Sequence, residues 1–416
     1  MFNINNNINN DKKILDILNK EKERQENQIT LIASENYASK AVLDAQGTIF
    51  TNKYAEGNIK NRYYAGCKYM DEIEKIAIYR AKKLFKVKYV NVQPHSGSQA
   101  NFAAYLSVLN KGDTVLGMKL SHGGHLTHGS KVNFSGKLYN FIYYKTNNLG
   151  EINYLELERI AIKYKPKMIV GGFSSYSGNC NWKKMRNIAD KIKAYLLVDI
   201  SHIAGLILAG LYKNPIPYAH IVTSTTHKTL GGPRGGIIMS NIKDKNILKK
   251  IDMSVFPGTQ GGPLMHVILA KAISFKEAMS NNFKKYQIQI IKNVNIMINQ
   301  FKKEKFNIVF KKSFNHLFMI DLRKNNSTGI EIENILSKAN IIVNKNSIPD
   351  DKLNHFITSG IRIGTPAITR RGFKEKESKK ISKWIIKIIK NKKNIEIVKN
   401  IKNKVKILCK KYPVYK

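Results

Sequence analysis

The chain has 416 residues, of which 43% are hydrophobic, and a formal net charge of +42, because 71 lysines and arginines outnumber 29 aspartates and glutamates. This length and composition predict a folded protein with two or three domains, and no apolar run reaches the roughly 20 residues of a membrane span. The positive charge is mainly lysine scattered along the chain, without a patch of arginine and aromatic residues. We interpret it as solvated surface and predict no specific nucleic-acid partner.

The amino terminus, MFNINNNINNDKK, has neither the continuous apolar core nor the cleavage site of a signal peptide. We expect a frayed polar leader there and predict a cytoplasmic location. The cysteines are Cys67, Cys180 and Cys409, and they form no C-x-x-C pair. This pattern argues against a disulfide framework and against a structural zinc site.

Short apolar runs alternate with helical stretches in the middle of the chain, which is typical of an α/β fold with a parallel sheet between helices. The predicted strands are 89–93, 114–118, 167–173, 194–200, 220–225 and 235–240. The stretch 275–306 has helix-like apolar spacing and leads into a second unit, so we place a domain boundary near residue 280. In that unit 305–310, 317–322 and 341–345 resemble strands of a smaller α+β domain, followed by a basic helical tail.

A candidate phosphate site lies in VQPHSGSQANFAAY, where a strand ends, a Gly/Ser loop follows and a helix begins near Ser98. Backbone N–H groups at a helix start, together with the hydroxyls of Ser96 and Ser98, favour an anion such as phosphate. The same residues also cap helices that bind nothing.

The stretch SHGGHLTHGS places three histidines at regular intervals, His122, His125 and His128. Such a set could ligate zinc, but paired glycines oppose a helix here and no carboxylate accompanies the cluster. A histidine face could equally cover a planar cofactor. We therefore predict no metal site.

Asp199 ends the apolar strand in YLLVDISHIAG. A carboxylate at the carboxyl end of a parallel strand faces the crevice in which open α/β sheets bind ligands, and it can keep a pyridinium nitrogen protonated. His202 follows three residues later and could stack on a ring or serve only the structure.

Lys228 stands among small neutral residues in TSTTHKTLGGPRGG. The small neighbours would let a flat ligand approach, and Arg234 or a pocket of low polarity would lower the lysine pKa toward the neutral amine that attacks carbonyls. A solvated turn is the alternative. Together, a phosphate cup, an aspartate, a stacking histidine and this lysine predict pyridoxal 5′-phosphate as the cofactor.

The chain resembles the serine hydroxymethyltransferase family from about Leu31 to Tyr415. The matching blocks are LIASENY, TNKYAEG, NVQPHSGSQAN, HGGHLTHG, KMIVGGFSSYSG, TTHKTLGGPRGG, VFPGTQGGPLMH and TSGIRIGTPAITRRG. The resemblance implies a fold-type I pyridoxal-phosphate enzyme with a mostly parallel seven-stranded sheet. It also implies an amino-terminal arm (1–50), a large cofactor domain (51–280) and a small α+β domain (281–416).

The resemblance also implies roles for individual residues. Lys228 would bond covalently to the cofactor, and Glu56, Tyr54, Tyr64 and His227 would complete the catalytic set. Cofactor contacts are implied for Ser34, Ser96, Gly97, Ser98, His125, Ser174, Asp199, His202, His227, Lys228 and Arg234, with Gly261 and Gly262 from a neighbouring subunit. Arg362 would clamp the substrate carboxylate, assisted by Tyr54, Glu56 and Tyr64. Folate contacts are implied for Leu120, Gly124, His125, Leu126, Asn346, Asn354, His355 and Phe356.

The implied reaction converts L-serine and tetrahydrofolate reversibly into glycine and 5,10-methylenetetrahydrofolate, in a homodimer with shared active sites. The segment DDKLNHF before Thr358 departs from the family pattern at the folate edge. One alternative is therefore a folate-independent aldolase of β-hydroxy amino acids that uses the same cofactor. The other is a lysine-rich nucleic-acid-binding protein that has lost catalysis.

Overall fold

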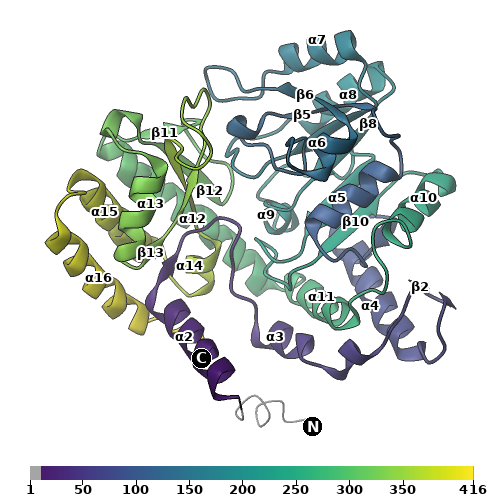
Figure 1. Cartoon of the computed structure of the whole chain (residues 1–416), viewed down its shortest axis with the longest axis horizontal. Helices are drawn as coiled ribbons and strands as arrows, with labels where there is room; N and C mark the ends of the chain where they lie inside the picture. Colours follow the sequence, from purple (N-terminus) through teal and green to yellow (C-terminus); the bar gives the residue numbers. More distant parts are fainter. Residues whose placement is uncertain (1–10, 416) are drawn as a thin grey trace.

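A seven-stranded sheet forms the centre of the larger unit in the computed structural model, which describes residues 11–415 (Figure 1). The strand order is β4-β10-β9-β8-β7-β5-β6, and β10 alone runs antiparallel to its neighbours, β4 and β9. The strands are β4 (Tyr89–Asn91), β5 (Thr114–Met118), β6 (Asn140–Tyr144), β7 (Met168–Gly172), β8 (Tyr195–Asp199), β9 (Ile221–Thr225) and β10 (Gly236–Ser240).

Side chains that alternate along these strands enter two different cores. Leu116, Ile169 and Leu196 belong to one cluster, whereas their neighbours Val115 and Met168 belong to another on the opposite face. Because successive strand residues point to opposite faces, a strand buried on both sides is apolar throughout. The helices of this unit are α3 (Lys40–Gln46), α4 (Lys68–Phe85), α5 (Gly97–Leu106), α6 (Phe134–Leu138), α7 (Tyr154–Tyr164), α8 (Trp182–Lys191), α9 (Ala204–Leu208), α10 (Lys245–Val255) and α11 (Met265–Ala278).

The smaller unit contains a four-stranded antiparallel sheet of order β11-β12-β15-β14. Its strands are β11 (Asn307–Val309), β12 (Leu317–Asp321), β14 (Asn344–Asn346) and β15 (Gly360–Gly364), and its helices are α12 (Asn281–Lys303), α13 (Gly329–Lys338), α14 (Pro366–Arg370), α15 (Glu375–Lys390) and α16 (Ile395–Lys410). These elements, drawn in green and yellow in Figure 1, enclose a core to which Ile29 and Leu31 of the amino-terminal segment also belong.

The amino-terminal segment lies against the smaller unit. Helix α2 (Lys12–Asn27) packs on α16, and β1 (Ile29–Thr30) pairs in parallel with β13 (Ile341–Ile342). The expected polar leader falls mostly on residues 1–10, outside the described residues, but Lys12 and Lys13 already belong to α2. They are helical because the side chain of Asp11 accepts hydrogen bonds from the first turn.

The predicted α/β class is confirmed, and each predicted strand of the large sheet is present within about two residues. Strands β6 and β15 were missed, and the predicted strand 341–345 is split into β13 and β14, which join different sheets. The predicted helical stretch 275–306 is interrupted at Met279 and Ser280, where α11 ends and α12 begins. Within residues 11–415, no helix is both long enough and apolar enough to cross a membrane.

Candidate active site

A small cavity lies beyond the carboxyl ends of β7, β8 and β9, and it contains Lys228. Its lining residues are His125, His128, Phe173, Ser174, Asp199, Ser201, His202 and Lys228. The structure therefore brings together five of the residues predicted from the sequence, which are Lys228, Asp199, His125, His202 and Ser174. The position agrees with the rule that open α/β sheets bind ligands at the carboxyl ends of their strands.

Lys228 follows the last residues of β9 and is only 8% exposed. Burial lowers the pKa of its amine to about 8; Asp199 opposes this effect, and Arg362 adds to it. A much larger fraction of the amine is therefore neutral near pH 7 to 8 than for a lysine with the ordinary pKa of about 10.4.

The glycines after Lys228 pack against α11. A Cβ added to Gly232 would stand 2.5 Å from Ser274 Oγ, and one added to Gly235 would stand 2.5 Å from Lys271 Cε. The sequence analysis attributed the small residues around Lys228 to the approach of a flat ligand. In the structure, these two glycines leave room for the side chains of α11 where the loop meets the helix.

Asp199 is buried at the cavity and lies close to three polar groups. Its Oδ2 accepts a hydrogen bond from Asn101 Nδ2 at 2.9 Å, its Oδ1 accepts one from the Ser201 amide at 2.9 Å, and His128 Nε2 lies 3.4 Å from Oδ2. Burial alone would raise the pKa of this carboxyl, but His128, His125 and Lys228 outweigh it and hold the pKa below its usual range. Asp199 is therefore an ionised carboxylate inside the cavity.

His125 and His202 are neutral near pH 7, because burial lowers the pKa of each ring. Burial lowers the pKa of His125 to about 3, and its Nδ1 lies 2.7 Å from Thr127 Oγ1. Burial also lowers the pKa of His202, whose ring stacks on His316 with centroids 5.3 Å apart. His202 thus has a protein ring as a neighbour, which the sequence analysis did not foresee.

His122 does not join His125 and His128. It bonds to Thr146 Oγ1 at 2.9 Å and lies outside the cavity of Lys228. Across residues 11–415, no group of three or more His, Cys, Asp or Glu side chains is arranged to hold a metal ion. Cys67, Cys180 and Cys409 are all free and buried.

The phosphate loop forms the start of α5. Ser96 caps this helix by accepting a hydrogen bond from the Gln99 amide at 3.1 Å. The amides of Gly97 and Ser98 have no protein acceptor within the described part of the chain. A Cβ on Gly97 would stand 2.5 Å from Thr225 Cγ2, so glycine is needed where the loop meets β9. Open amides at a helix start fit a phosphate group.

Arg362 lies in the middle of β15 and reaches toward the larger unit. Its Nη1 donates to the Ser174 carbonyl at 2.7 Å, and its Nε donates to Asn344 Oδ1 at 3.0 Å. Burial lowers the pKa of this guanidinium to about 10, which still leaves it charged at neutral pH. Its other nitrogen, Nη2, makes no hydrogen bond within residues 11–415 and is available for a carboxylate.

Other predicted cofactor residues lie outside the cavity of Lys228. Ser34, His227 and Arg234 line a neighbouring cavity of about 510 Å³, together with residues of the amino-terminal segment such as Glu35 and Tyr37. His227 is half-buried, and its buried Nδ1 has no hydrogen-bond partner among the described residues.

Tyr54, Glu56 and Tyr64 form a separate surface cluster with Gly261 and Gly262. The rings of Tyr54 and Tyr64 meet edge to face at 5.5 Å, and the two side chains are 57% and 49% exposed. A Cβ on Gly261 would stand 3.1 Å from Glu56 Oε1, and one on Gly262 would stand 3.3 Å from the Tyr54 ring. The cluster adjoins β2 (Gly57–Asn58), which lies at the outer edge of the large unit in Figure 1. Within one chain, these residues do not line the cavity of Lys228.

The predicted folate residues are mostly at the surface. Leu120 and Leu126 are exposed, as are Asn354, His355 and Phe356, whereas Gly124 is buried and its carbonyl accepts a hydrogen bond from Ser174 Oγ at 2.6 Å. Asn346 Nδ2 donates to the Ser347 carbonyl at 2.7 Å.

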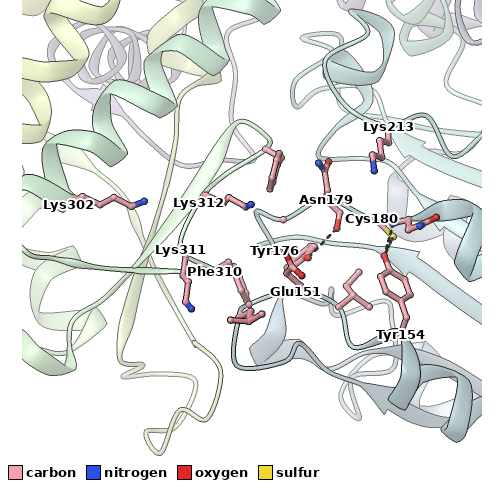
Figure 2. Close-up of a pocket in the computed structure, with 16 residues that line it drawn as sticks. Glu151, Tyr154, Tyr176, Asn179, Cys180, Lys213, Lys302, Phe310, Lys311 and Lys312 are labelled. Carbon is pink, nitrogen blue, oxygen red and sulfur yellow. Dashed lines mark hydrogen bonds between the residues drawn. The ribbon is translucent and has the colours of Figure 1, made fainter.

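A larger cavity of about 650 Å³ opens between the two units, as Figure 2 shows. Lys302, Lys311 and Lys312 border it on the side of the smaller unit, and Lys213 borders it on the other side. This larger cavity contains none of the predicted site residues, so the volume of a cavity does not by itself identify the active site of this chain.

Comparison with known proteins agrees with this geometry. The family model described as "SHMT: Serine hydroxymethyltransferase" matches residues 8–385. The chain is 64% identical over 406 residues to a serine hydroxymethyltransferase of Wigglesworthia glossinidia brevipalpis, which covers 98% of this chain and 97% of that protein. It is 62% identical over 405 residues to one of Buchnera aphidicola subsp. Acyrthosiphon pisum (strain 5A), which covers 97% of each chain.

The chain belongs to the serine hydroxymethyltransferase family. The predicted function and enzyme class are confirmed, as is the predicted fold-type I architecture of this family. Membership in the serine hydroxymethyltransferase family implies pyridoxal phosphate as the cofactor. The residues on this chain fit that group, since they supply a buried amine, an ionised carboxylate, a neutral ring and open amides at a helix start.

The predicted cofactor residues omit His128, Phe173 and Ser201, which line the cavity, and also Asn101 and His316, which hydrogen-bond to lining residues. Asn101 links Asp199 to Thr127 Oγ1 and also accepts a hydrogen bond from Thr223 Oγ1, at 2.6 Å. His316 bonds to His202 and to the Ala33 carbonyl. Asn101 and His316 are each a single polar residue within an ordinary helix or loop sequence, so no local pattern marks them.

Proposed function

We propose that this chain converts L-serine and tetrahydrofolate reversibly into glycine and 5,10-methylenetetrahydrofolate, with pyridoxal 5′-phosphate bonded to Lys228. The observation that carries the proposal is the buried amine of Lys228 in one cavity with the ionised Asp199 and the neutral His125. When bound, the pyridoxal ring serves as an electron sink for cleavage of the bond between Cα and the hydroxymethyl carbon.

The residues of this chain hold and orient the reacting groups. Lys228 would bond to the cofactor through its neutral amine, and the ionised Asp199 would hold the pyridine nitrogen in its protonated form. His125 would contact the ring without adding charge. The amides of Gly97 and Ser98, with the Ser96 hydroxyl, receive the phosphate.

Arg362 clamps the carboxylate of serine or glycine. Its guanidinium is pre-oriented by the Ser174 carbonyl and by Asn344, so less freedom is lost when the substrate binds. Ser174 and His202 line the cavity of Lys228 and would contact the cofactor there.

Glu56 transfers the proton to and from the substrate hydroxyl, and Tyr54 and Tyr64 lie beside it. Tyr54 and Tyr64 are exposed and Glu56 is half-buried, and none of the three lines the cavity of its own chain, which supports their donation to a second copy. Gly261 and Gly262 pack against the same cluster, so they enter the active site of the second copy together with it. We therefore propose a homodimer in which each active site takes residues from both chains.

Ser34, His227 and Arg234 complete the cofactor environment from the neighbouring cavity. Tetrahydrofolate binds over the exposed edge formed by the candidate folate residues, Leu120, Gly124, His125, Leu126, Asn346, Asn354, His355 and Phe356. The core of the smaller sheet contains no residue of 51–280, which supports a division into an arm (1–50), a large domain (51–280) and a small domain (281–416). Six residues of the small domain also join the main core of the larger unit: Phe283, Ile290, Val309, Phe310, Met319 and Ile348. A cytoplasmic location stays a prediction.

Serine cleavage measured with and without tetrahydrofolate tests this function. We expect rapid glycine formation only with tetrahydrofolate, and the product to be 5,10-methylenetetrahydrofolate. Equal rates in both assays would favour the folate-independent aldolase. Lys228→Ala should abolish both turnover and the visible absorption of lysine-bound cofactor, whereas Lys276→Ala, which changes an exposed lysine of α11, should alter neither. A colourless wild-type protein with tight, salt-sensitive RNA binding would favour the nucleic-acid alternative.

A further inference from the structure

Lys271, on α11, is a buried lysine with no role in the mechanism above. It is 1% exposed, and its Nζ donates to three main-chain carbonyls, those of Val92 at 2.7 Å, Pro94 at 3.0 Å and Gly236 at 2.8 Å. An ammonium group has three N–H donors, so all of them are used. Because a buried ammonium is stable only with good partners, these three carbonyls and the lysine fix one another in place.

The carbonyls that Lys271 binds belong to two segments that meet at the candidate phosphate site. Val92 and Pro94 stand just before Ser96, and Gly236 begins β10. The Gly236 amide also donates to the Pro94 carbonyl at 3.0 Å. A Cβ on Gly236 would stand 2.3 Å from the Ser96 carbonyl oxygen and 3.1 Å from the Gly97 nitrogen. The ammonium therefore ties the chain that enters α5 to the start of β10, immediately next to the open amides.

Gly235 makes room for this lysine. Because an added Cβ would stand 2.5 Å from Lys271 Cε, any larger residue there would displace the side chain or the loop. Gly235 lies at the end of the loop that carries Lys228, so Lys271 contacts both the phosphate loop and the segment that follows the reactive lysine.

We propose that Lys271 is a positioning residue for the cofactor phosphate: through Val92, Pro94 and Gly236 it holds the start of α5 so that the Gly97 and Ser98 amides face the phosphate. Lys271 acts through the backbone, since all its donors are used by carbonyls. This inference rests on the proposed phosphate site at residues 96–98. It assigns to Lys271 the stabilisation of the backbone conformation of that site.

The test compares two ligands that differ only in the phosphate. The apoenzyme is titrated with pyridoxal 5′-phosphate and with pyridoxal, and the dissociation constants are read from the absorbance of lysine-bound ligand. Lys271→Met keeps the length of the side chain and removes the ammonium. We expect it to weaken binding of pyridoxal 5′-phosphate by about tenfold or more and binding of pyridoxal by less than about twofold. Inorganic phosphate should also compete less well for the variant.

Two further variants separate positioning from general destabilisation. Ile268→Ala creates a cavity one turn earlier on the same helix, at a residue that is 1% exposed, and should lower the melting temperature without changing the ratio of the two affinities. Gly235→Ala retains Lys271 but places a methyl group too close to its Cε. It should therefore weaken binding of pyridoxal 5′-phosphate more than binding of pyridoxal. It provides a second test if Lys271→Met does not fold.

Each outcome separates this inference from the proposed function. A wild-type enzyme that binds pyridoxal as tightly as pyridoxal 5′-phosphate would overturn the phosphate site itself, and this inference with it. Lys271→Met and Gly235→Ala could both prefer pyridoxal 5′-phosphate over pyridoxal as strongly as the wild type does. That result would overturn only the role of Lys271. Equal weakening of both ligands would reduce Lys271 to a structural residue and likewise refute the proposal.

Discussion

Asn101 Nδ2 donates a hydrogen bond to Asp199 Oδ2 at 2.9 Å, which connects the first turns of α5 to the end of β8. The two residues are 98 positions apart in the sequence. Asn101 also donates a hydrogen bond to Thr127 Oγ1, which in turn bonds to Nδ1 of His125. The Asn101 side chain therefore helps to orient both the Asp199 carboxylate and, through Thr127, the His125 ring.

Replacing Asn101 should impair the reaction while leaving the fold intact. A hydrogen bond to a charged group contributes about 1.5 to 3 kcal/mol, so Asn101→Ala should lower kcat/KM for serine roughly 10- to 100-fold. Steady-state kinetics with tetrahydrofolate measure this effect. Asn110→Ala changes an exposed asparagine after the same helix and should keep wild-type kinetics. Unchanged kinetics in Asn101→Ala would show that Asp199 does not need this partner.

The pKa of Lys228 predicts how fast the apoenzyme takes up its cofactor at different pH values. The neutral amine is the nucleophile, and burial lowers the pKa of Lys228 to about 8. Uptake should therefore accelerate as the pH rises and become constant above about pH 8. Stopped-flow absorbance of apoenzyme mixed with pyridoxal 5′-phosphate gives this profile.

Asp199→Asn supplies the matched test, because the charge of Asp199 raises the pKa of Lys228. Without that charge, the midpoint of the pH profile of cofactor uptake should move to lower pH. Asp190→Asn, at an exposed position on α8, should leave it in place. A midpoint near the ordinary lysine value of 10.5 in the wild type would contradict the low polarity assigned to the site.

The sequence predicts the large sheet well, because its strands are continuous apolar runs between helical stretches. It fails for β6, whose residues Asn140–Tyr144 are mostly half-buried at the sheet edge, and for β15, which appears in the sequence as a neutral motif around one arginine. Lys228 and Asp199 could be predicted because Asp199 ends an apolar strand and Lys228 follows one closely. Asn101, His316 and Lys271 could not, since their roles depend on partners far away in the sequence.

Arg362 should determine substrate affinity more than cofactor binding. Lysine lacks the planar fork of arginine and cannot reach the Ser174 carbonyl and the substrate carboxylate in the same geometry. We expect Arg362→Lys to raise the KM for serine about 100-fold, equivalent to about 2.7 kcal/mol, with an unchanged cofactor spectrum. Arg323→Lys, which alters a half-exposed arginine two residues after β12, is the control for this exchange. A normal KM in Arg362→Lys would assign the carboxylate to another group.

Mixing two inactive variants tests whether the active site is shared between chains. Lys228→Ala and Glu56→Gln should each be nearly inactive as homodimers. If Glu56 acts in the partner's cavity, a mixed dimer has one site with both changes and one site with neither. Random exchange of equal amounts should then restore about a quarter of wild-type activity, because about half of the dimers are mixed and half of their sites are intact.

The control for this experiment pairs Lys228→Ala with Asp199→Asn. These two residues line the same cavity of one chain, so every site of a mixed dimer keeps one of the two defects and activity should not return. Native mass spectrometry of chains with different tags confirms that exchange has occurred. Verified exchange without recovery for Lys228→Ala and Glu56→Gln would mean that Glu56 serves its own chain. The loop 54–64 would then have to leave its place beside Gly261 and Gly262 to reach Lys228.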